Sequence, residues 1–302
     1  MTLPAPTAMP VQRSDALRAV LFTCLAYGLF NICDVAIKYT AERYHTAQVL
    51  FINAVFIILL LGGYGLVRDR KRAFRTKKFK LMTMHALLAQ VAGVCNVLAF
   101  PHMQLTMFYT LVFTSPLWVA LLSIVFMKDK AEPRRLMAIV AGLGIVVLTL
   151  RPGGGMDMWS LLVLLGSFAY SVQLLIMRRI GRDESRLFMV MYGAVVTLLV
   201  TAPFLPGNFK VPEMFDWSMF LLGAAAAAGG LLTVSYAFQI APSPSVVAPY
   251  HYTQIVWGAI LGYLVFGDVP DTHVIAGAVG LIMAGAYLIY DETRRPVLKL
   301  GA

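Results

Sequence analysis

The chain has little charge for its length. Asp, Glu, Lys and Arg make up 13% of its 302 residues, whereas an ordinary globular domain carries about 25%. Hydrophobic residues account for 59% of the sequence, and the mean hydropathy is +0.75. So few charges cannot cover the surface of a soluble protein of this size. The composition therefore argues against a soluble protein and indicates a chain that is solvated mainly by lipid.

The sequence also lacks the short motifs of several enzyme classes. It contains no Walker A sequence, no HExxH, no GxSxG and no Cys/His set with metal-ligand spacing. Its three cysteines, Cys24, Cys33 and Cys95, lie in apolar stretches, which argues against a disulfide framework. We therefore expect no enzymatic activity, no cofactor, no metal and no transport powered by ATP bound to this chain.

The chain contains many long apolar segments. About 20 apolar residues in a helix cross a bilayer core, and ten such segments follow one another with short connections. They are residues 16–38, 46–67, 81–100, 104–127, 135–150, 158–178, 187–205, 217–239, 245–266 and 273–290. The sequence therefore predicts an all-α polytopic membrane protein with ten transmembrane helices, leaving no room for a soluble domain.

Basic residues mark alternate connections between these segments. If the N-terminus is cytoplasmic, 21 of the 25 Lys and Arg residues lie on the cytoplasmic side and 4 lie outside. Such a bias sets the orientation of membrane proteins, and it predicts that both termini are cytoplasmic in the inner (plasma) membrane of a bacterium. The basic run from Arg68 to Lys80 is expected to meet anionic lipid headgroups rather than nucleic acid.

The two halves of the sequence resemble each other at a spacing of about 139 residues. Residues 114–126 parallel residues 253–266, with Thr, Trp and a closing Phe in common. Because each half holds five spans, an odd number, the second copy enters the membrane from the opposite face. Inverted repeats of this kind are typical of secondary transporters, although an ancient duplication without mechanistic meaning is the alternative.

This symmetry gives the predicted domain organisation. A short cytoplasmic segment and a cytoplasmic tail flank two five-helix repeats that surround a central cavity. The four parts are residues 1–15, 16–150, 158–290 and 291–302.

Several residues carry a family resemblance. Lys38 ends the first span, Thr114-Ser-Pro-Leu117 lies in the fourth, and Asp129 and Asp268 follow the fourth and ninth. With the stretch 252–268, they resemble the EamA-type repeat of the drug/metabolite transporter superfamily. Within it, the chain is most similar to YddG-type exporters of aromatic amino acids. The resemblance implies export by alternating access. The chain departs from the family pattern in carrying Asp where the repeats usually carry Glu.

Polar side chains inside membrane spans are expensive and usually face protein or a water-filled cavity. In the first span Tyr27, Asn31, Asp34 and Lys38 share one helical face. Asp34 and Lys38 are four residues apart, so we expect them to pair. Asp34 could bind an amino acid's charged group, relay protons or form a structural ion pair. Lys38 is expected to snorkel toward the outer interface.

Polar and aromatic residues of other spans complete a predicted substrate site. Each amide could instead bridge two helices through a structural hydrogen bond, and each aromatic residue could belong to the core. The predicted substrate-binding residues are Asn31, Asp34, His85, Gln90, Asn96, Tyr109, Gln173, Tyr250, Gln254 and Trp257.

Two prolines lie inside predicted spans. Pro116 lacks an N–H and frees the carbonyl of Val112, and Pro249 does the same for Ser245. Freed carbonyls are tolerated at membrane depth where they line a cavity. We therefore expect Pro116 and Pro249 to bend the fourth and ninth spans and to act in gating.

These observations lead to one functional hypothesis with two rivals. The chain is predicted to export small organic solutes, above all aromatic and other apolar amino acids, by alternating access. The alternatives are an exporter of drugs, purines or other metabolites, and a membrane-embedded lipid enzyme. Expected partners are the solute and the lipid bilayer, without nucleic acid. The small-residue patterns Ala138-x3-Gly142 and Ala276-x3-Gly280 are expected to pack helices within a monomer rather than to form a homodimer.

Overall fold

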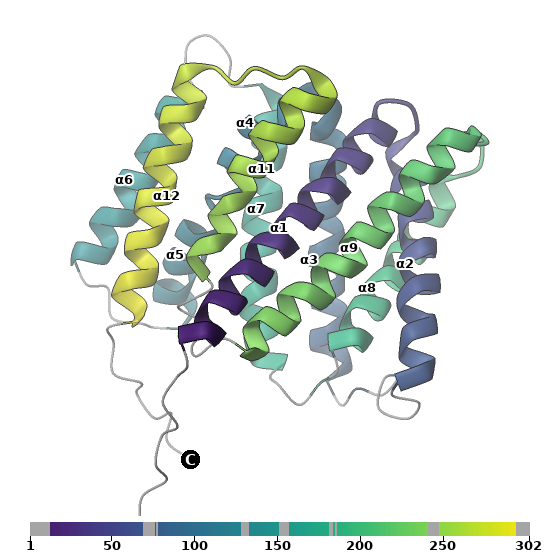
Figure 1. Cartoon of the computed structure of the whole chain (residues 1–302), viewed down its shortest axis with the longest axis horizontal. Helices are drawn as coiled ribbons and strands as arrows, with labels where there is room; N and C mark the ends of the chain where they lie inside the picture. The colour runs from purple at the N-terminus through teal and green to yellow at the C-terminus, as the bar shows by residue number, and fades with distance from the viewer. Residues whose placement is uncertain are drawn as a thin grey trace, which may run out of the picture.

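The computed structural model describes residues 13–68, 76, 78–127, 133–150, 157–180, 184, 186–240 and 248–293. Within these ranges all regular structure is helical (Figure 1). Eight of the predicted spans are single α-helices, and their ends lie within a few residues of the predicted ones. They are α1 (Arg13–Ala41), α2 (Thr46–Arg68), α3 (Phe79–Ala99), α6 (Pro133–Leu150), α7 (Met158–Ile180), α8 (Arg186–Thr201), α9 (Met214–Ile240) and α12 (Thr272–Thr293). Short 3-10 turns, η1 (Phe100–His102) and η2 (Ala202–Phe204), extend α3 and α8.

The fourth and ninth spans, which the sequence predicts to bend at Pro116 and Pro249, are each divided into shorter helical segments. The fourth consists of α4 (Leu105–Val112) and α5 (Ser115–Met127). The ninth consists of a 3-10 helix, η3 (Ala248–Tyr252), an α-helix, α11 (Thr253–Leu261), and a π-helical turn, η4 (Gly262–Phe266). Its predicted first residues, 245–247, lie outside the described residues.

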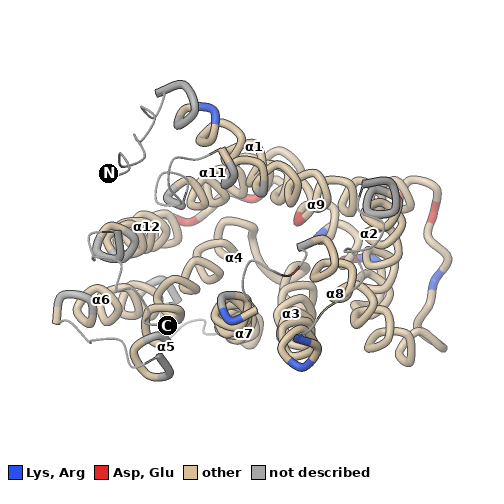
Figure 2. The backbone as a smooth tube through the Cα atoms, turned by 90° about the horizontal axis from the view of Figure 1, so that it is seen from below, with Lys and Arg blue, Asp and Glu red and all other residues tan. Residues whose placement is uncertain are grey.

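The helices have the length and composition of membrane spans. Among the described residues, seven helical segments are long and apolar enough to cross a membrane, and α6 and α12 contain shorter apolar helices. Figure 2 shows few charged residues along the described helices. Large apolar side chains point outward instead, such as Leu148, 74% exposed, and Leu199, 71% exposed. This surface suits lipid rather than water and fits a polytopic membrane protein.

The main helix contacts each join one helix from the first half to one from the second. The most extensive packing is between α1 and α9, followed by α3 with α7. The pair α2 and α8 lies at one edge of the bundle, and α6 and α12 lie at the other (Figure 1). The broken helices α4 and α11 lie between these edges, so they occupy the middle of the molecule.

Glycines permit the close approach of several of these helices. On α9, a Cβ added to Gly230 would lie 2.8 Å from the ring of Phe30 on α1. On α12, a Cβ added to Gly280 would lie 2.9 Å from Ile145 on α6. Both distances are shorter than real Cβ contacts, so an added Cβ would force the neighbouring side chain to shift. Gly142 of the α6 pattern meets Leu117 of α5 instead, where an added Cβ would lie 2.7 Å away, so the two small-residue patterns contact different helices of the same chain.

The largest cluster of buried apolar side chains surrounds α4. Phe108, Tyr109 and Leu111 of α4 pack with side chains from α5, α6, α7, α11 and α12. This cluster fixes the two broken helices relative to the rest of the bundle. The first described helix begins, and the last one ends, at the same end of the bundle (Figure 1).

Candidate functional site

The polar face of α1 meets α4 and α11. The hydroxyl of Tyr109 on α4 donates a hydrogen bond of 2.6 Å to Asp34 Oδ2 on α1. The Tyr109 side chain is 2% exposed, and its ring lies directly on Gly258 of α11, where any Cβ would collide with it. Three helices therefore converge on this carboxylate–phenol pair, which joins two predicted site residues.

Aromatic rings and an amide lie nearby on the same helices. Tyr27 of α1 stacks on His251 of η3 with ring centroids 4.5 Å apart, and Phe113 meets His251 edge-on at 5.0 Å. Asn31 is fully buried and donates to the Tyr27 carbonyl at 2.9 Å. Its Oδ1 has no hydrogen-bond partner among the described residues. Trp257 of α11 faces Gly28 of α1 and is half-exposed.

The break in the fourth span is held by hydroxyl groups of α7. Ser167 Oγ donates to the Val112 carbonyl at 3.1 Å, and Ser171 Oγ donates to the Ser115 carbonyl at 3.1 Å. Thr114 in the break is hydrogen bonded to Ser167 at 2.8 Å. The predicted release of the Val112 carbonyl by Pro116 is therefore confirmed. Sequence reasoning missed the two serines, although their spacing of four residues on one helix was an available signal.

A second set of predicted residues bridges α3 to α7 and α8. Gln173 and His85 are hydrogen bonded at 3.2 Å, and Thr197 donates to Gln90 Oε1 at 2.6 Å. Asn96 packs against Gly166, where an added Cβ would lie 3.0 Å from Asn96 Oδ1. The bonds of His85, Gln173 and Gln90 are the interhelical hydrogen bonds expected under the structural alternative, whereas Asn96 Oδ1 has no hydrogen-bond partner among the described residues. The predicted site thus separates into an α1–α4–α11 group and an α3–α7–α8 group.

The remaining predicted residues of the ninth span lie on η3 and α11. Tyr250 of η3 is half-exposed, and its carbonyl accepts a hydrogen bond from Thr253 at 2.6 Å. Gln254 is buried on α11. Pro249 lies in η3, where the helix is of the 3-10 type, while Ser245 lies outside the described residues.

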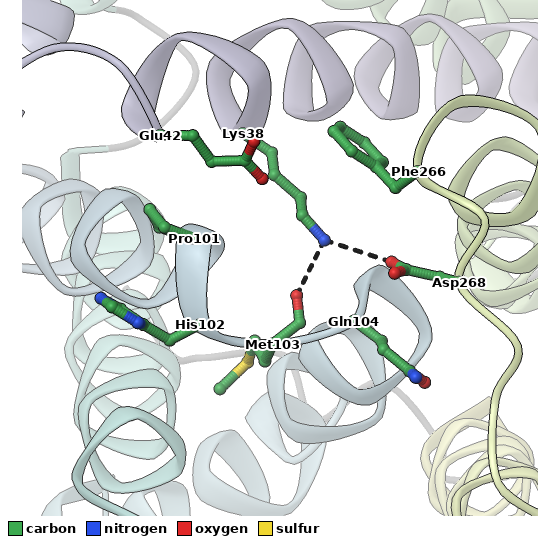
Figure 3. Close-up of a pocket in the computed structure, with 8 residues that line it drawn as sticks. All are labelled: Lys38, Glu42, Pro101, His102, Met103, Gln104, Phe266 and Asp268. Carbon is green, nitrogen blue, oxygen red and sulfur yellow. Dashed lines mark hydrogen bonds and ion pairs between the residues drawn. The ribbon is translucent and has the colours of Figure 1, made fainter.

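The predicted pairing of Lys38 with Asp34 is wrong. Lys38 Nζ donates to Asp268 Oδ2 at 3.1 Å and to the Met103 carbonyl at 2.9 Å (Figure 3). The Lys38 side chain is 6% exposed, so it turns into the protein instead of snorkelling outward. Asp34 instead accepts a hydrogen bond from Tyr109. Its partner is therefore a residue distant in sequence, and not Lys38 one helical turn away.

This ion pair lines a cavity of about 420 Å³. Figure 3 shows the side chains around it, among them the Glu42 carboxylate, the His102 imidazole and the Phe266 ring. The other lining residues are Glu42, Pro101, His102, Gln104 and Phe266. Among the described residues, no group of three His, Cys, Asp or Glu side chains is placed to hold a metal ion. The arrangement suits polar or charged organic groups.

The connection between α1 and α2 is tied to the one between α8 and α9. Gln48 donates to the Lys210 carbonyl at 2.6 Å and accepts from the Lys210 amide at 2.9 Å. The Tyr44 hydroxyl donates to Asp216. Loss of hydration and this hydrogen bond raise the pKa of the Tyr44 phenol above its usual value. These contacts fasten the α1–α2 connection and the start of α2 to the α8–α9 connection and the start of α9.

Comparison with known proteins identifies similar chains. The S-adenosylmethionine uptake transporter of Rickettsia bellii is 24% identical over 88% of this chain and 91% of its own length. The pseudopaline exporter CntI of Pseudomonas aeruginosa PAO1 is 24% identical over 89% and 95%. The riboflavin transporter of Brucella anthropi is 25% identical over 89% and 96%. A crystal structure with 18% identity aligns with a TM-score of 0.56, covering 92% of this chain and 98% of its own.

These relatives are named for three different solutes, and none of the three names specifies aromatic amino acid export, so the finer resemblance to YddG-type exporters is not established by them. Their names indicate transporters of small molecules and not enzymes. The model of the EamA-like transporter family matches twice, over residues 17–151 and 157–291. The two matches cover nearly the whole chain and coincide with the two predicted repeats. The chain therefore belongs to the EamA-like transporter family.

Proposed function

We propose that the chain is a secondary transporter that works by alternating access through two inverted five-helix repeats. A two-fold axis that exchanges the halves would superpose α1 on α7 and α9 on α3. The α1–α9 contact is therefore the counterpart of the α3–α7 contact. The α2–α8 and α6–α12 pairs map onto themselves. These are the main helix packings of the structure, and such symmetry permits two related conformations. The proposed location is a bacterial inner membrane, with both termini cytoplasmic.

The arrangement around Asp34 and Tyr109 carries the proposal for the solute. Charged and amide groups of α1 lie on the same helices as an aromatic cluster, in which Tyr27 of α1 stacks on His251 of η3 and Phe113, directly after α4, meets His251 edge-on. Asp34 offers a carboxylate, and Asn31 offers an unpartnered carbonyl oxygen. Such a site suits a solute with a flat apolar part and an amino group, since rings stack on rings and carboxylates attract ammonium groups.

Aromatic amino acids meet this description and are the proposed solutes, with export as the proposed direction. The relatives are named for S-adenosylmethionine, pseudopaline and riboflavin, and their names include both uptake and export. A solute panel must therefore include these compounds, and flux must be measured in both directions. In this proposal Asn31, Asp34, Tyr109 and Trp257 contact the solute, and the α3–α7–α8 group holds the helices around it.

The test is counterflow in liposomes that contain the purified full chain. We expect labelled phenylalanine or tryptophan to exchange against unlabelled solute. Replacing Tyr109 by Phe removes one hydrogen bond to a charged group, worth about 1.5–3 kcal/mol, and should lower flux at least about tenfold. Tyr236→Phe is the matched control, because Tyr236 is half-exposed on α9 and packs edge-on against Phe22. Absence of flux for every solute in the panel would overturn the proposal.

Proton coupling is tested separately through Asp34. If Asp34 exchanges a proton with the solute, an imposed pH gradient should drive accumulation in the parent and not in Asp34→Asn. Counterflow without a gradient should be slower in Asp34→Asn, which lacks the carboxylate that binds the solute, but should remain measurable. Facilitated diffusion predicts the same initial rate with and without the gradient. The measurement is the initial rate of labelled solute entry at matched total solute.

A further inference from the structure

Asp268 connects three elements at one end of the bundle. Its Oδ2 accepts from Lys38 at the end of α1 at 3.1 Å and from the Leu105 backbone N–H at the start of α4 at 3.4 Å. Asp268 itself lies between η4 and α12. The carboxylate of the second half therefore meets two helices of the first half, and the ammonium that it binds also holds the Met103 carbonyl before α4.

The backbone before Asp268 directs its carboxylate toward α1. Gly267 has φ = +70°, a left-handed conformation that side chains with a Cβ rarely adopt. The amides of Gly267 and Asp268 close the π-helical turn by bonding the carbonyls of Tyr263 and Gly262. The chain reverses at this point, and Asp268 points back to Lys38 (Figure 3).

The ion pair is shielded from solvent. The side chains of Lys38 and Asp268 are 6% and 17% exposed, and the Phe266 ring lies 4.4 Å from Lys38 Nζ. Removal of one partner would leave the other charge largely buried and uncompensated, which strongly disfavours the closed arrangement. The pair is therefore sensitive to any motion that separates α11 and η4 from α1 and α4.

The pair lies at the end of the bundle that alternating access must open and close. The connection between η4 and α12 is at the opposite end from the start of α1 (Figure 1), which makes it the outer end in the proposed orientation. We propose that Lys38 and Asp268 form an outer lock, which holds this end closed and separates when the end opens toward the solute. The proposal rests on alternating access as stated under the proposed function.

The Lys38–Asp268 lock differs from the Asp34–Tyr109 pair, which lies one helical turn deeper along α1. Asp34 and Tyr109 both belong to the first half, so their hydrogen bond persists if α1 and α4 move together. Lys38 and Asp268 belong to different halves, so relative movement of the halves breaks their contact. Both residues are positioning residues, which set the population of the closed state.

The test measures the outer end directly, without any solute. Spin labels are attached to His45→Cys on the α1–α2 connection and Thr272→Cys at the start of α12, both exposed positions. The native Cys24, Cys33 and Cys95 are replaced by alanine, and the full chain is reconstituted in lipid nanodiscs. Double electron–electron resonance then gives the distance distribution between the labels. We expect one dominant short distance, and at least a threefold larger long-distance population in Asp268→Asn.

Two further variants separate a lock from a general structural role. Asp268→Glu retains the charge and should restore the short distance. Glu42→Gln removes another carboxylate of the same cavity, while Lys38 keeps its bonds to Asp268 and Met103, so its distribution should match the parent.

If Asp268→Asn does not yield folded protein, Lys38→Met serves as the equivalent test and should enlarge the same population. A folded variant with the distribution of the parent overturns the lock, and so does an equal shift in Glu42→Gln. If the parent chain shows no flux for any solute, the proposed function is refuted. The distances between the labels still decide whether the Lys38–Asp268 lock exists. The two failures are thus distinguishable.

Discussion

The fourth and ninth spans occupy corresponding places in the two halves, yet they break in different ways. The fourth has one break, at residues 113–114, and hydroxyls of α7 donate hydrogen bonds to the Val112 and Ser115 carbonyls on either side of it. The ninth changes helix type twice, from 3-10 to α to π. A proline close to the break accounts for the first case. The second places Gly258 under Tyr109 and Asp268 beside Lys38, so it organises contacts with the first half.

The comparison shows that corresponding helices can divide their tasks. The break in the fourth span is stabilised by serine side chains of α7. The ninth span lies against α1 and α4, and Asp268 directly after it pairs with Lys38. The following predictions test whether this division is real, beginning with the largest expected effect.

Gly258→Ala should be the most damaging change, because it inserts a Cβ into the ring of Tyr109. Overpacking of this kind costs about 1–3 kcal/mol, and we expect the upper value because the ring is confined on all sides. The melting temperature in detergent and the counterflow rate should both fall. Gly144→Ala is the control, since an added Cβ there meets nothing within 4 Å. Equal behaviour of the two variants would show that the contact between α4 and α11 is unimportant.

Pro116→Ala restores a backbone N–H that can bond the Val112 carbonyl. The helices α4 and α5 should then tend to merge, and the bond from Ser167 to that carbonyl should be lost. We expect transport to slow about fivefold, equivalent to about 1 kcal/mol, while the protein remains folded and inserted. Counterflow together with size-exclusion chromatography checks this. A variant with the transport rate of the parent would argue against a gating role for the break.

Ser167→Ala should give the smallest of the three effects. It removes the hydroxyl that bonds both the Val112 carbonyl and Thr114, and an interhelical hydrogen bond in the membrane is worth about 0.6 kcal/mol on average. The thermal stability should fall slightly, and Ser167→Ala combined with Pro116→Ala should be no less stable than Ser167→Ala alone. Ser218→Ala serves as the control, because Ser218 is exposed and bonds only within its own helix. Fully additive losses would show that the serine does not act through the freed carbonyl.

Sequence reasoning predicted which polar residues of α1 share a face better than it predicted their partners. The helical spacing of Tyr27, Asn31 and Asp34 predicted a single polar face on α1, and these side chains do lie toward α4 and η3 or α11. The same reasoning paired Asp34 with Lys38 and was wrong. Spacing along one helix shows which residues share a face, but it does not show which residue of another helix will face them.

The sequence by itself determined the membrane class, eight of the helices and the release of the Val112 carbonyl. These depend on local properties of the chain. One is the hydropathy over about 20 residues, and the other is the absence of an N–H at Pro116, four residues after Val112. Only the tertiary structure decided the partners. Lys38 binds a carboxylate 230 residues away, and Ser167 meets a carbonyl on another helix. A buried polar group is satisfied by whichever complementary group the packing of the helices brings near it, and that packing depends on the whole chain.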